Sequence, residues 1–422
     1  MPITETDLAH RLRHARESAG LTQDDVAGRL GLARSSVAQI ELGNRSVSSL
    51  ELDRLARLYG RSLGDFLAEE FDPAASLVAV FRAQAGTAGR DALLGTATHA
   101  IELARELAGL QELLDLERLR LSAPSYALPA PRGKWEAVRQ GEQAAAEERR
   151  RLGLGDAPLG DAALLLESQG VRTALLPLPA DVSGLALMDP HLSFFVVNNQ
   201  SHPVLRRRFS WVHEYAHVLF DRDRRGTVSR EAERGDLAEV RANAFAAALL
   251  MPAEGVRRVL DGLGKGRGSR ERWELYDENQ QGDVLPAEGR TEAGSQEIQL
   301  YDVLLLARRF GVSRTAALYR LKNLRLLSHA DFERLFEQEQ SGRAAAVERS
   351  LGLPPWRAPA PASAPSDTPE PPDGDFRTRF LSLALEAYRR DKISRGKLVE
   401  LGRLVGREEG EIEELVEWLG WG

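Results

Sequence analysis

The stretch RRRFSWVHEYAHVLFD, residues 206–221, decides more about this chain than any other. His213 and His217 are four residues apart, and on a helix two such positions lie on the same face. Both imidazoles can then bind one Zn²⁺. The carboxylate of Glu214 can act as a base towards water and as an acid towards a leaving amine. The motif therefore predicts a zinc site with His213 and His217 as ligands and Glu214 as the catalytic residue.

A surface helix with two exposed histidines is the alternative interpretation of the same motif. The residues around it are too apolar for that: Trp211, Val212, Ala216, Val218 and Leu219. Such a segment is expected to be buried, and a buried cluster of two histidines and a glutamate without partners is costly. The metal site is therefore the favoured interpretation.

Zinc normally takes a third protein ligand and leaves its fourth position open to water. We expect Glu239 to be this ligand, because it begins a second predicted helix in LAEVRANAFAAALLMP (237–252). The other face of that helix is small and apolar and suits packing against the first helix. The alternative ligands are Asp221, Asp223 and Asp236. Asn243, one turn beyond Glu239, either orients a ligand or bonds the backbone, and we favour the structural role.

Composition limits the possible classes of protein. The chain has 422 residues, which predicts two to four domains, and 43% hydrophobic and 28% charged residues. The absence of cysteine excludes disulfides, cysteine metal sites and thiol nucleophiles. A polar N-terminus and the lack of a long apolar run predict a cytoplasmic protein without a membrane partner. With a net charge of −7, any contact with DNA must come from a local patch.

The N-terminal segment LTQDDVAGRLGLARSSVAQIELGNRSVSSLELDRLARLYG (21–60) reads as short helices, two of them joined at Gly31. Apolar residues recur at helical spacing, and the expected buried positions are Val26, Ala27, Leu30, Val37 and Ile40. Over residues 6–67 this pattern resembles the Xre/lambda-repressor helix-turn-helix family.

That resemblance implies binding to double-stranded operator DNA, usually as a homodimer on a two-fold site. Gln23 would bond a phosphate, and the next helix would lie in the major groove. Base edges would be contacted by Arg34, Ser35, Ser36 and Gln39, and phosphates by Asn44 and Arg45.

A domain that binds only protein is the alternative, because acidic residues outnumber basic ones in residues 1–70. The DNA-binding interpretation requires the arginines to cluster on one face: Arg11, Arg13, Arg16, Arg34 and Arg45.

RRRFSWVHEYAHVLFD followed by EVRANAFAAALLMP resembles the ImmA/IrrE metallopeptidase family, and the resemblance covers residues 135–330. It implies a thermolysin-like site, with His213, His217 and Glu239 on zinc and Glu214 as general base. Known substrates in that family are DNA-binding repressors cut at one position. Two departures stand out: Trp211 replaces a smaller residue and would narrow the site, and the long insertion 262–296 would cover it.

The expected fold class is α+β, mostly α, with an all-α helix-turn-helix domain and an α+β zincin-like metallopeptidase domain that contains a small sheet. We read strands at VRTALLPLP, VSGLALMD and LSFFVVNN, and helices at about 203–220 and 232–250. Arg208 with Phe209 is expected to pack or pair behind the zinc helix, although a solvated helix start is equally compatible.

The expected organisation has seven parts. They are a DNA-binding domain (1–70), a helical connector with a dimerisation or spacer role (75–121), a linker (122–134), the peptidase domain (135–330) with an irregular insertion (262–296), a helical extension (331–353), a disordered Pro-rich linker (354–374) and C-terminal helices (375–420). The segment 300–327 also has a helix-turn-helix rhythm, and we prefer a place in the peptidase domain over a second DNA site.

The leading hypothesis is a transcription regulator, connected with stress response, whose zinc peptidase domain cuts a partner repressor, itself a helix-turn-helix protein. A non-catalytic transcription factor with a sensor or effector-binding domain is the alternative. A repressor cut by its own peptidase domain is the third and least favoured hypothesis.

Overall fold

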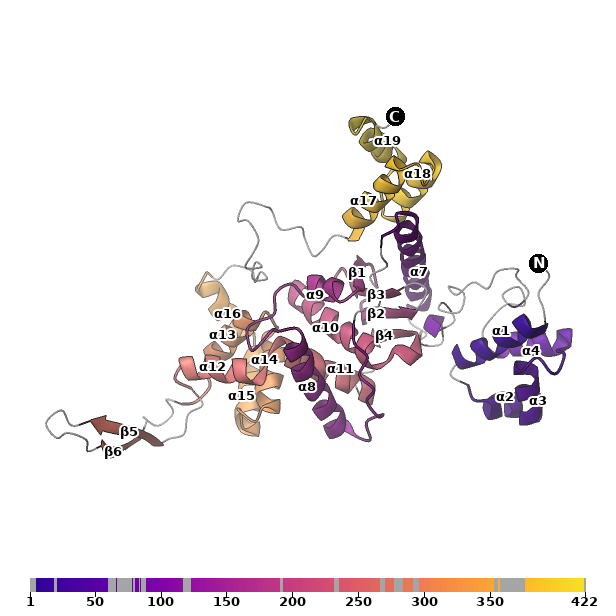
Figure 1. The fold of residues 1–422 in the computed structure, drawn as a ribbon. Helices are drawn as coiled ribbons and strands as arrows, with labels where there is room; N and C mark the ends of the chain where they lie inside the picture. The colour runs from indigo at the N-terminus through magenta and orange to yellow at the C-terminus, as the bar shows by residue number, and fades with distance from the viewer. Residues whose placement is uncertain are drawn as a thin grey trace.

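The computed structural model describes most of the chain. The described residues are 5–18, 21–59, 66, 78, 80–82, 84, 89–116, 123–189, 193–230, 235–265, 270–276, 284–290, 296–352, 356 and 376–420. The fold is the predicted one: a mainly helical chain with an N-terminal helix-turn-helix region and a second region of helices around a small sheet (Figure 1).

The N-terminal region is a bundle with a core of its own. Its helices are α1 (Glu5–Ser18), α2 (Gln23–Leu30), α3 (Arg34–Glu41) and α4 (Ser49–Leu58). Thr22 and Asp25 form a capping box that starts α2, and Gly31 ends the helix with a positive φ of 67°. The core contains Val26, Ala27, Val37 and Ile40, as expected, and Leu30 packs against it while half-buried.

The sheet has four strands in the order β1-β3-β2-β4. They are β1 (Val171–Leu176), β2 (Val182–Asp189), β3 (Ser193–Asn199) and β4 (Gly226–Arg230). β1 runs parallel to β3, whereas β2 runs antiparallel to both β3 and β4. The first three strands were predicted; β4, on the outer edge, was not.

Both faces of this sheet are covered, which explains the uninterrupted apolar run of β3. Because side chains alternate along a strand, Phe194 and Val196 enter one hydrophobic core, while Phe195 and Val197 enter the other. A strand with one solvent-exposed face would alternate apolar and polar residues instead.

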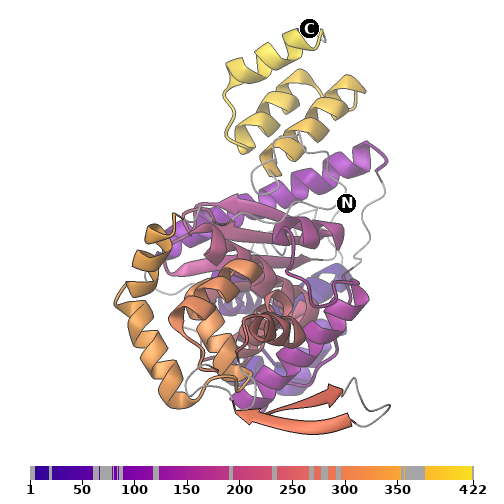
Figure 2. The same cartoon turned by 90° about the vertical axis from the view of Figure 1, so that its left-hand side faces the viewer.

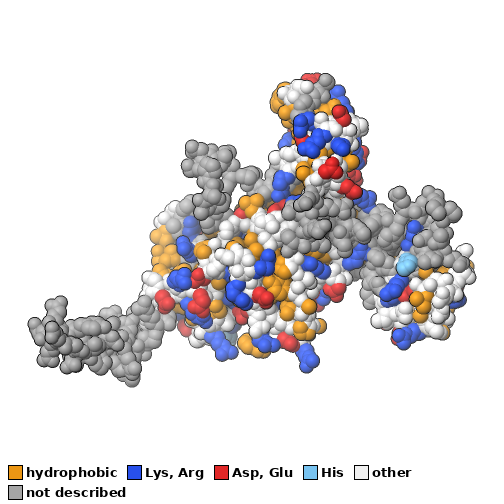
Figure 3. Space-filling view, viewed as in Figure 1, with side chains coloured by type: hydrophobic (Ala, Val, Ile, Leu, Met, Phe, Trp, Pro, Cys, Tyr) orange, Lys and Arg blue, Asp and Glu red, His pale blue; other side chains and the backbone are white. Residues whose placement is uncertain are grey.

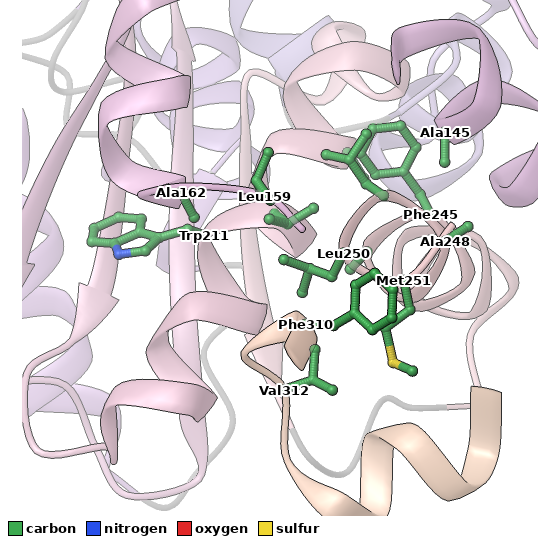
Figure 4. Close-up of a cluster of buried hydrophobic side chains, with 14 of the residues drawn as sticks. Ala145, Leu159, Ala162, Trp211, Phe245, Ala248, Leu250, Met251, Phe310 and Val312 are labelled. Atoms are coloured by element: carbon green, nitrogen blue, oxygen red, sulfur yellow. The ribbon is translucent and has the colours of Figure 1, made fainter. Parts of the chain in front are cut away.

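The first face carries the helices that position the motif residues. They are α8 (Lys134–Arg151), α9 (Ala162–Ser168), α10 (Val204–Phe220) and α11 (Leu237–Leu250). Trp211 of α10, Phe245 of α11 and Phe310 belong to their shared core (Figure 4). α8 and α11 touch closely at Gly141, where a Cβ would lie 2.4 Å from the carbonyl oxygen of Arg241. Only glycine fits there.

Further helices extend this core towards the C-terminus: α12 (Ala253–Gly262), α13 (Leu300–Phe310), α14 (Arg314–Asn323), α15 (His329–Gln340) and α16 (Arg343–Ser350). The segment 300–327, considered above as a second DNA site, is integrated here. Leu318 and Leu321 are buried in the core, and Arg320 donates to the carbonyl of Met251 at 2.9 Å.

The second face is covered by helices from two distant parts of the chain. Of these helices, α7 (Arg90–Leu113) and α17 (Phe376–Arg389) contact the sheet, and α18 (Arg395–Leu404) and α19 (Glu409–Trp418) extend the same layer outward. α17 and α18 stack on α7 (Figure 2), and Phe376 meets Phe195 of β3 edge to face at 5.2 Å. The apolar face of α7 is thus used within the chain, and dimerisation through it stays a prediction.

Charged side chains of both signs are interspersed over the visible surface of α17–α19 (Figure 3). Two ion pairs tie this module to the rest of the chain: Lys397 bonds Glu106 at 3.0 Å, and Arg379 bonds Glu167 at 2.8 Å. The module is therefore docked by an apolar core with a polar margin.

The expectation that the insertion 262–296 is irregular is wrong for its described part. β5 (Arg270–Tyr276) and β6 (Val284–Arg290) form an antiparallel hairpin, which projects away from the body of the molecule (Figures 1 and 2). These strands do not cover the motif helix. A short 3₁₀ turn, η1 (Arg222–Arg224), follows α10.

Most of the Pro-rich segment 354–374 lies outside the described residues, but Trp356 is placed. The guanidinium of Arg208 lies 4.8 Å from the centroid of its ring. Among the described helices, none is long and apolar enough to span a bilayer.

We expect the second core to contribute to the stability of the sheet. Phe380 of α17 is fully buried, so Phe380→Ala should lower the free energy of unfolding by about 3–5 kcal/mol. Urea unfolding measures this loss. Trp418→Ala is the control, because Trp418 is 80% exposed and should change stability by less than about 0.5 kcal/mol. Equal stability of the two variants would contradict the packing described.

Candidate metal centre

α10 presents both motif histidines to the first turn of α11. His213 Nε2 lies 3.1 Å from Glu239 Oε2, and His217 Nε2 lies 3.1 Å from Glu239 Oε1. The two Nε2 atoms are 3.3 Å apart. Among the described residues, this is the one group of three or more His, Cys, Asp or Glu side chains placed to hold a metal ion. The chain therefore brings together the three predicted ligands.

Both histidines are oriented by a partner on the other ring nitrogen. His213 Nδ1 lies 3.1 Å from Asn243 Oδ1, and His217 Nδ1 lies 2.8 Å from Asp221 Oδ2. These oxygens accept a hydrogen bond from Nδ1–H, and in the neutral ring this leaves the lone pair of Nε2 for a metal. Asn243 thus orients a ligand, which is the role we did not favour from the sequence.

The second oxygen of Asp221 ties the two helices together. Arg241 of α11 donates to Asp221 Oδ1 at 2.7 Å, and its guanidinium lies 5.1 Å from the ring centroid of Phe220. Burial raises the pKa of Asp221, but His217 and Arg241 outweigh burial, and the pKa lies below its usual value. Asp221 is therefore a buried, ionised link between the ligand helices.

Burial and close contact shift the pKa values of the expected ligands. Burial alone would lower the pKa of His217, but hydrogen bonds to Asp221 and Glu239 raise it to about 10. Burial alone would raise the pKa of Glu239, but both histidines hold it well below its usual range. The pocket thus favours positive charge beside these carboxylates.

Glu214 is completely buried, and neither carboxylate oxygen has a hydrogen-bond partner of good geometry within the described chain, although Ser229 is near enough to lower its pKa. Burial raises its pKa. Room for the carboxylate comes from Gly184 of β2, where a Cβ would lie 2.7 Å from Glu214 Oε1. Asn198 Oδ1 lies 2.9 Å from the same point and also lacks a described partner. A buried acceptor of this kind needs a proton, a water or a metal.

Ser229 of β4 is a site residue that the sequence did not reveal. Its hydroxyl lies 3.1 Å from His213 Nε2. The five residues GTVSR that form β4 lack a strong strand pattern, so nothing in the sequence placed Ser229 at the metal site.

The donor set fits zinc. A tetrahedral ion with bonds of about 2.0–2.1 Å holds its donors about 3.3 Å apart, and the three donor separations here are 3.1, 3.1 and 3.3 Å. Two imidazoles and one carboxylate are zinc donors, and the unpartnered Glu214 carboxylate adjoins them.

The three aspartates considered as alternative ligands lie away from the position between the histidines and Glu239. Asp221 bonds the far side of His217, Asp223 is exposed on η1, and Asp236 caps α11 by accepting from the backbone N–H of Ala238 at 2.7 Å. Trp211 packs in the core with Ala162 (Figure 4) rather than narrowing the metal site.

Arg208 is buried and packs behind α10. Its guanidinium donates to the backbone carbonyls of Leu159, at 2.6 Å, and Gly160. Burial lowers the pKa of Arg208 to about 10. Of the two interpretations of this arginine, the structure favours the packing role over a solvated helix start.

The expected base-contacting residues lie along α3 (Arg34–Glu41). Arg34, Ser35 and Gln39 are exposed, and Ser36 is half-buried. Arg34 also approaches Asp24 at 3.6 Å on the surface. These side chains are accessible to a groove, as the helix-turn-helix resemblance implies.

Gln23 is held by the protein itself. Its amide donates to Glu41 Oε2 at 2.9 Å, and the buried Glu41 pairs with Arg16 at 2.6 Å. Arg11 donates to the backbone carbonyl of Phe66. The DNA-binding interpretation required these arginines to lie on one face; Arg16 is buried in its pair with Glu41 and does not meet that condition, whereas Arg11 is half-buried.

The phosphate candidates differ in their surroundings. Asn44 is exposed, whereas Arg45 is half-buried and pairs with Glu51 at 2.6 Å. A phosphate contact from Arg45 would therefore compete with this ion pair.

A helix-turn-helix bundle followed by a domain with two histidines and a glutamate around one point defines the class: a DNA-binding type of protein with a metallopeptidase-like domain. Comparison with family models agrees. Residues 7–68 match a helix-turn-helix domain, and residues 166–273 match the IrrE N-terminal-like domain. The predicted combination of these two domains is confirmed. No curated protein matches the chain.

We expect Asp221 to determine how tightly the site holds a metal. Asp221→Asn keeps an acceptor for His217 but removes the charge that pairs with Arg241, so zinc affinity should fall about 10- to 100-fold. Competition with a chromogenic chelator measures the affinity. Asp223→Asn, the same change two residues away on the surface, should bind zinc like the wild type. If both variants bind zinc with equal affinity, Asp221 does not contribute to metal binding.

Proposed function

We propose that this chain is a cytoplasmic, DNA-binding transcription regulator whose second domain is a zinc-dependent endopeptidase acting on a protein partner. The observation that carries the proposal is the convergence of His213, His217 and Glu239 beside the buried, unpartnered carboxylate of Glu214. A purely structural site needs no such carboxylate. The match to the IrrE N-terminal-like domain supports a peptide bond as the target.

In this proposal His213, His217 and Glu239 hold Zn²⁺, which when bound supplies a Lewis acid that polarises the scissile carbonyl. Asn243 and Asp221 fix the ring orientations of the two histidines. Glu214 takes a proton from the attacking water and returns it to the leaving amine.

Glu214→Gln tests the chemistry. The variant keeps the ligands and should bind zinc as the wild type does, but hydrolysis should fall about 10²- to 10⁴-fold because the base is lost. Mass spectrometry of candidate repressors, incubated with each protein, measures cleavage. His217→Ala is the companion variant and should lose zinc as well. Undiminished cleavage by Glu214→Gln would end the peptidase proposal.

For the helix-turn-helix domain, we propose that it binds a two-fold operator as a homodimer. The residues of α3 that face the bases in this proposal are Arg34, Ser35, Ser36 and Gln39. Gln39→Ala should weaken binding to an operator selected from random DNA by about 5- to 150-fold, because a glutamine bonds adenine through two hydrogen bonds. Gel-shift titration measures it. Gln340→Ala, an exposed glutamine on α15, is the control. If Gln39→Ala binds like the control, α3 does not read bases.

A second candidate function has support from one observation. His217 and Glu214 are fully buried, and His213 and Glu239 are nearly so. A metal site closed to this degree also suits a sensor that controls DNA binding without turnover. Zinc-dependent operator binding that survives in Glu214→Gln, without cleavage by any variant, would favour the sensor.

A further inference from the structure

One row of residues crosses the sheet on the face that carries the motif helix. Gly184 of β2 pairs with Asn198 of β3 on one side and with Ser229 of β4 on the other. Residues directly opposite each other in a sheet project to the same face, and so do residues two positions apart in one strand. Ala186 and Val196, the next pair on this face, enter the core that contains α10. The row Asn198–Gly184–Ser229 therefore faces α10.

The middle of this row is open, because glycine has no side chain, and the carboxylate of Glu214 lies over it. A Cβ at Gly184 would lie 2.7 Å from Glu214 Oε1, 3.0 Å from Glu214 Cδ and 2.9 Å from Asn198 Oδ1. Gly184 is not one of the glycines with a positive φ, so its backbone conformation is open to any residue. The need for glycine at this position is therefore a need for space.

The two residues that flank the opening are buried and held in place. Asn198 is fully buried, and its Nδ2 donates to the backbone carbonyl of Arg207 in α10 at 2.8 Å. Ser229 is also buried; its hydroxyl interacts with the Glu214 carboxylate and lies 3.1 Å from His213 Nε2. We call the space over Gly184, between Asn198 and Ser229, the carboxylate slot. One end of the slot thus adjoins an expected metal ligand.

We propose that Gly184 is a positioning residue: the carboxylate slot that it leaves open holds Glu214 in the orientation that its role as a base requires. The inference rests on the proposed peptidase function. A glutamate side chain has several rotatable bonds, so its carboxylate needs neighbours that select one direction. A displacement of a reacting group by about 1 Å can lower the rate about 10²-fold. The missing methyl group at Gly184 therefore matters to the reaction rather than to metal binding.

Close packing of α10 on the sheet is a simpler role for Gly184, and it would require glycine because of the helix backbone. The three atoms nearest to an added Cβ argue against it, because all three belong to the side chains of Glu214 and Asn198. At Gly141 and Gly255, by contrast, the nearest atom is a backbone carbonyl oxygen, 2.4 Å away. Gly184 therefore makes room for a side chain, whereas those two glycines make room for backbone.

A double-mutant cycle in the full-length protein tests which atoms Gly184 accommodates. Gly184→Ala should lower the folding equilibrium constant about 5- to 150-fold, because a methyl group overpacks a buried site. The loss should be the same in a Glu214→Gln background, where the side chain keeps its size, and less than about fivefold in a Glu214→Ala background. Urea unfolding measures all three. Gly109→Ala on α7 is the control, because its Cβ would meet no atom within 4 Å, and it should lose no stability.

Three further measurements on Gly184→Ala separate positioning from general damage. A crystal structure should show the Glu214 carboxylate displaced by at least about 1 Å from its wild-type position. Zinc affinity, measured by competition with a chelator, should equal that of the wild type, because His213, His217 and Glu239 are untouched. With a repressor that the wild type cuts, kcat should fall at least about 10²-fold while KM stays the same.

Four results overturn the proposal. They are an equal loss of stability in the Glu214→Ala background, which would assign Gly184 to helix packing, an unmoved carboxylate in the structure of Gly184→Ala, a loss of zinc affinity as large as the loss of cleavage, and an unchanged kcat. Failure of the peptidase function gives a different pattern. If the wild type cuts no protein but the cycle and the crystal structure are as expected, the slot still positions Glu214, and only the reaction assigned to the site is wrong.

Discussion

The metal site of the second domain depends on one interaction: the carboxylate of Glu239 lies between two imidazoles of a neighbouring helix. Spacing along α10 brings His213 and His217 to one face, but only the close packing of α11 supplies the third donor. That packing needs small residues such as Ala242 and Ala246 in the core between the helices. The ion pair between Asp221 and Arg241 joins the same two helices from the other side of the ligands. The apolar packing of α10 against α11 and the ion pair between Asp221 and Arg241 thus stabilise the same arrangement of the three expected metal ligands.

The four-stranded sheet lies between this helical layer and a second one. α7 follows the DNA-binding bundle in sequence, and α17–α19 come from the end of the chain, yet they share a core on the back of the sheet. The strands that border the metal site are therefore supported by helices that precede them and helices that follow them in the sequence. The metal site and the C-terminal helices thus lie on opposite faces of one sheet of four short strands.

Local features of this protein could be predicted from the sequence, whereas features made by distant pairing could not. The ligand helix, its histidines and Glu239 follow from helical spacing, and β3 follows from a long apolar run. β4 was missed because GTVSR forms a strand only by pairing with β2. The contact of Ser229 with His213 depends on that pairing, and the docking of α17 and α18 on α7 depends on residues about three hundred positions apart. Arg16 looked like a DNA contact because its buried partner, Glu41, is far away in sequence.

The position of β4 in the chain limits which mutations this domain can accept without losing its metal site. β4 lies between His217 and Glu239, so one interval of the chain supplies both the outer strand and the approach to the third ligand. A residue inserted or deleted there would shift the ladder and the metal ligand together, and a one-residue shift would turn every side chain of β4 to the opposite face. New specificity is therefore more accessible through exchange of individual side chains than through changes in loop length at this point.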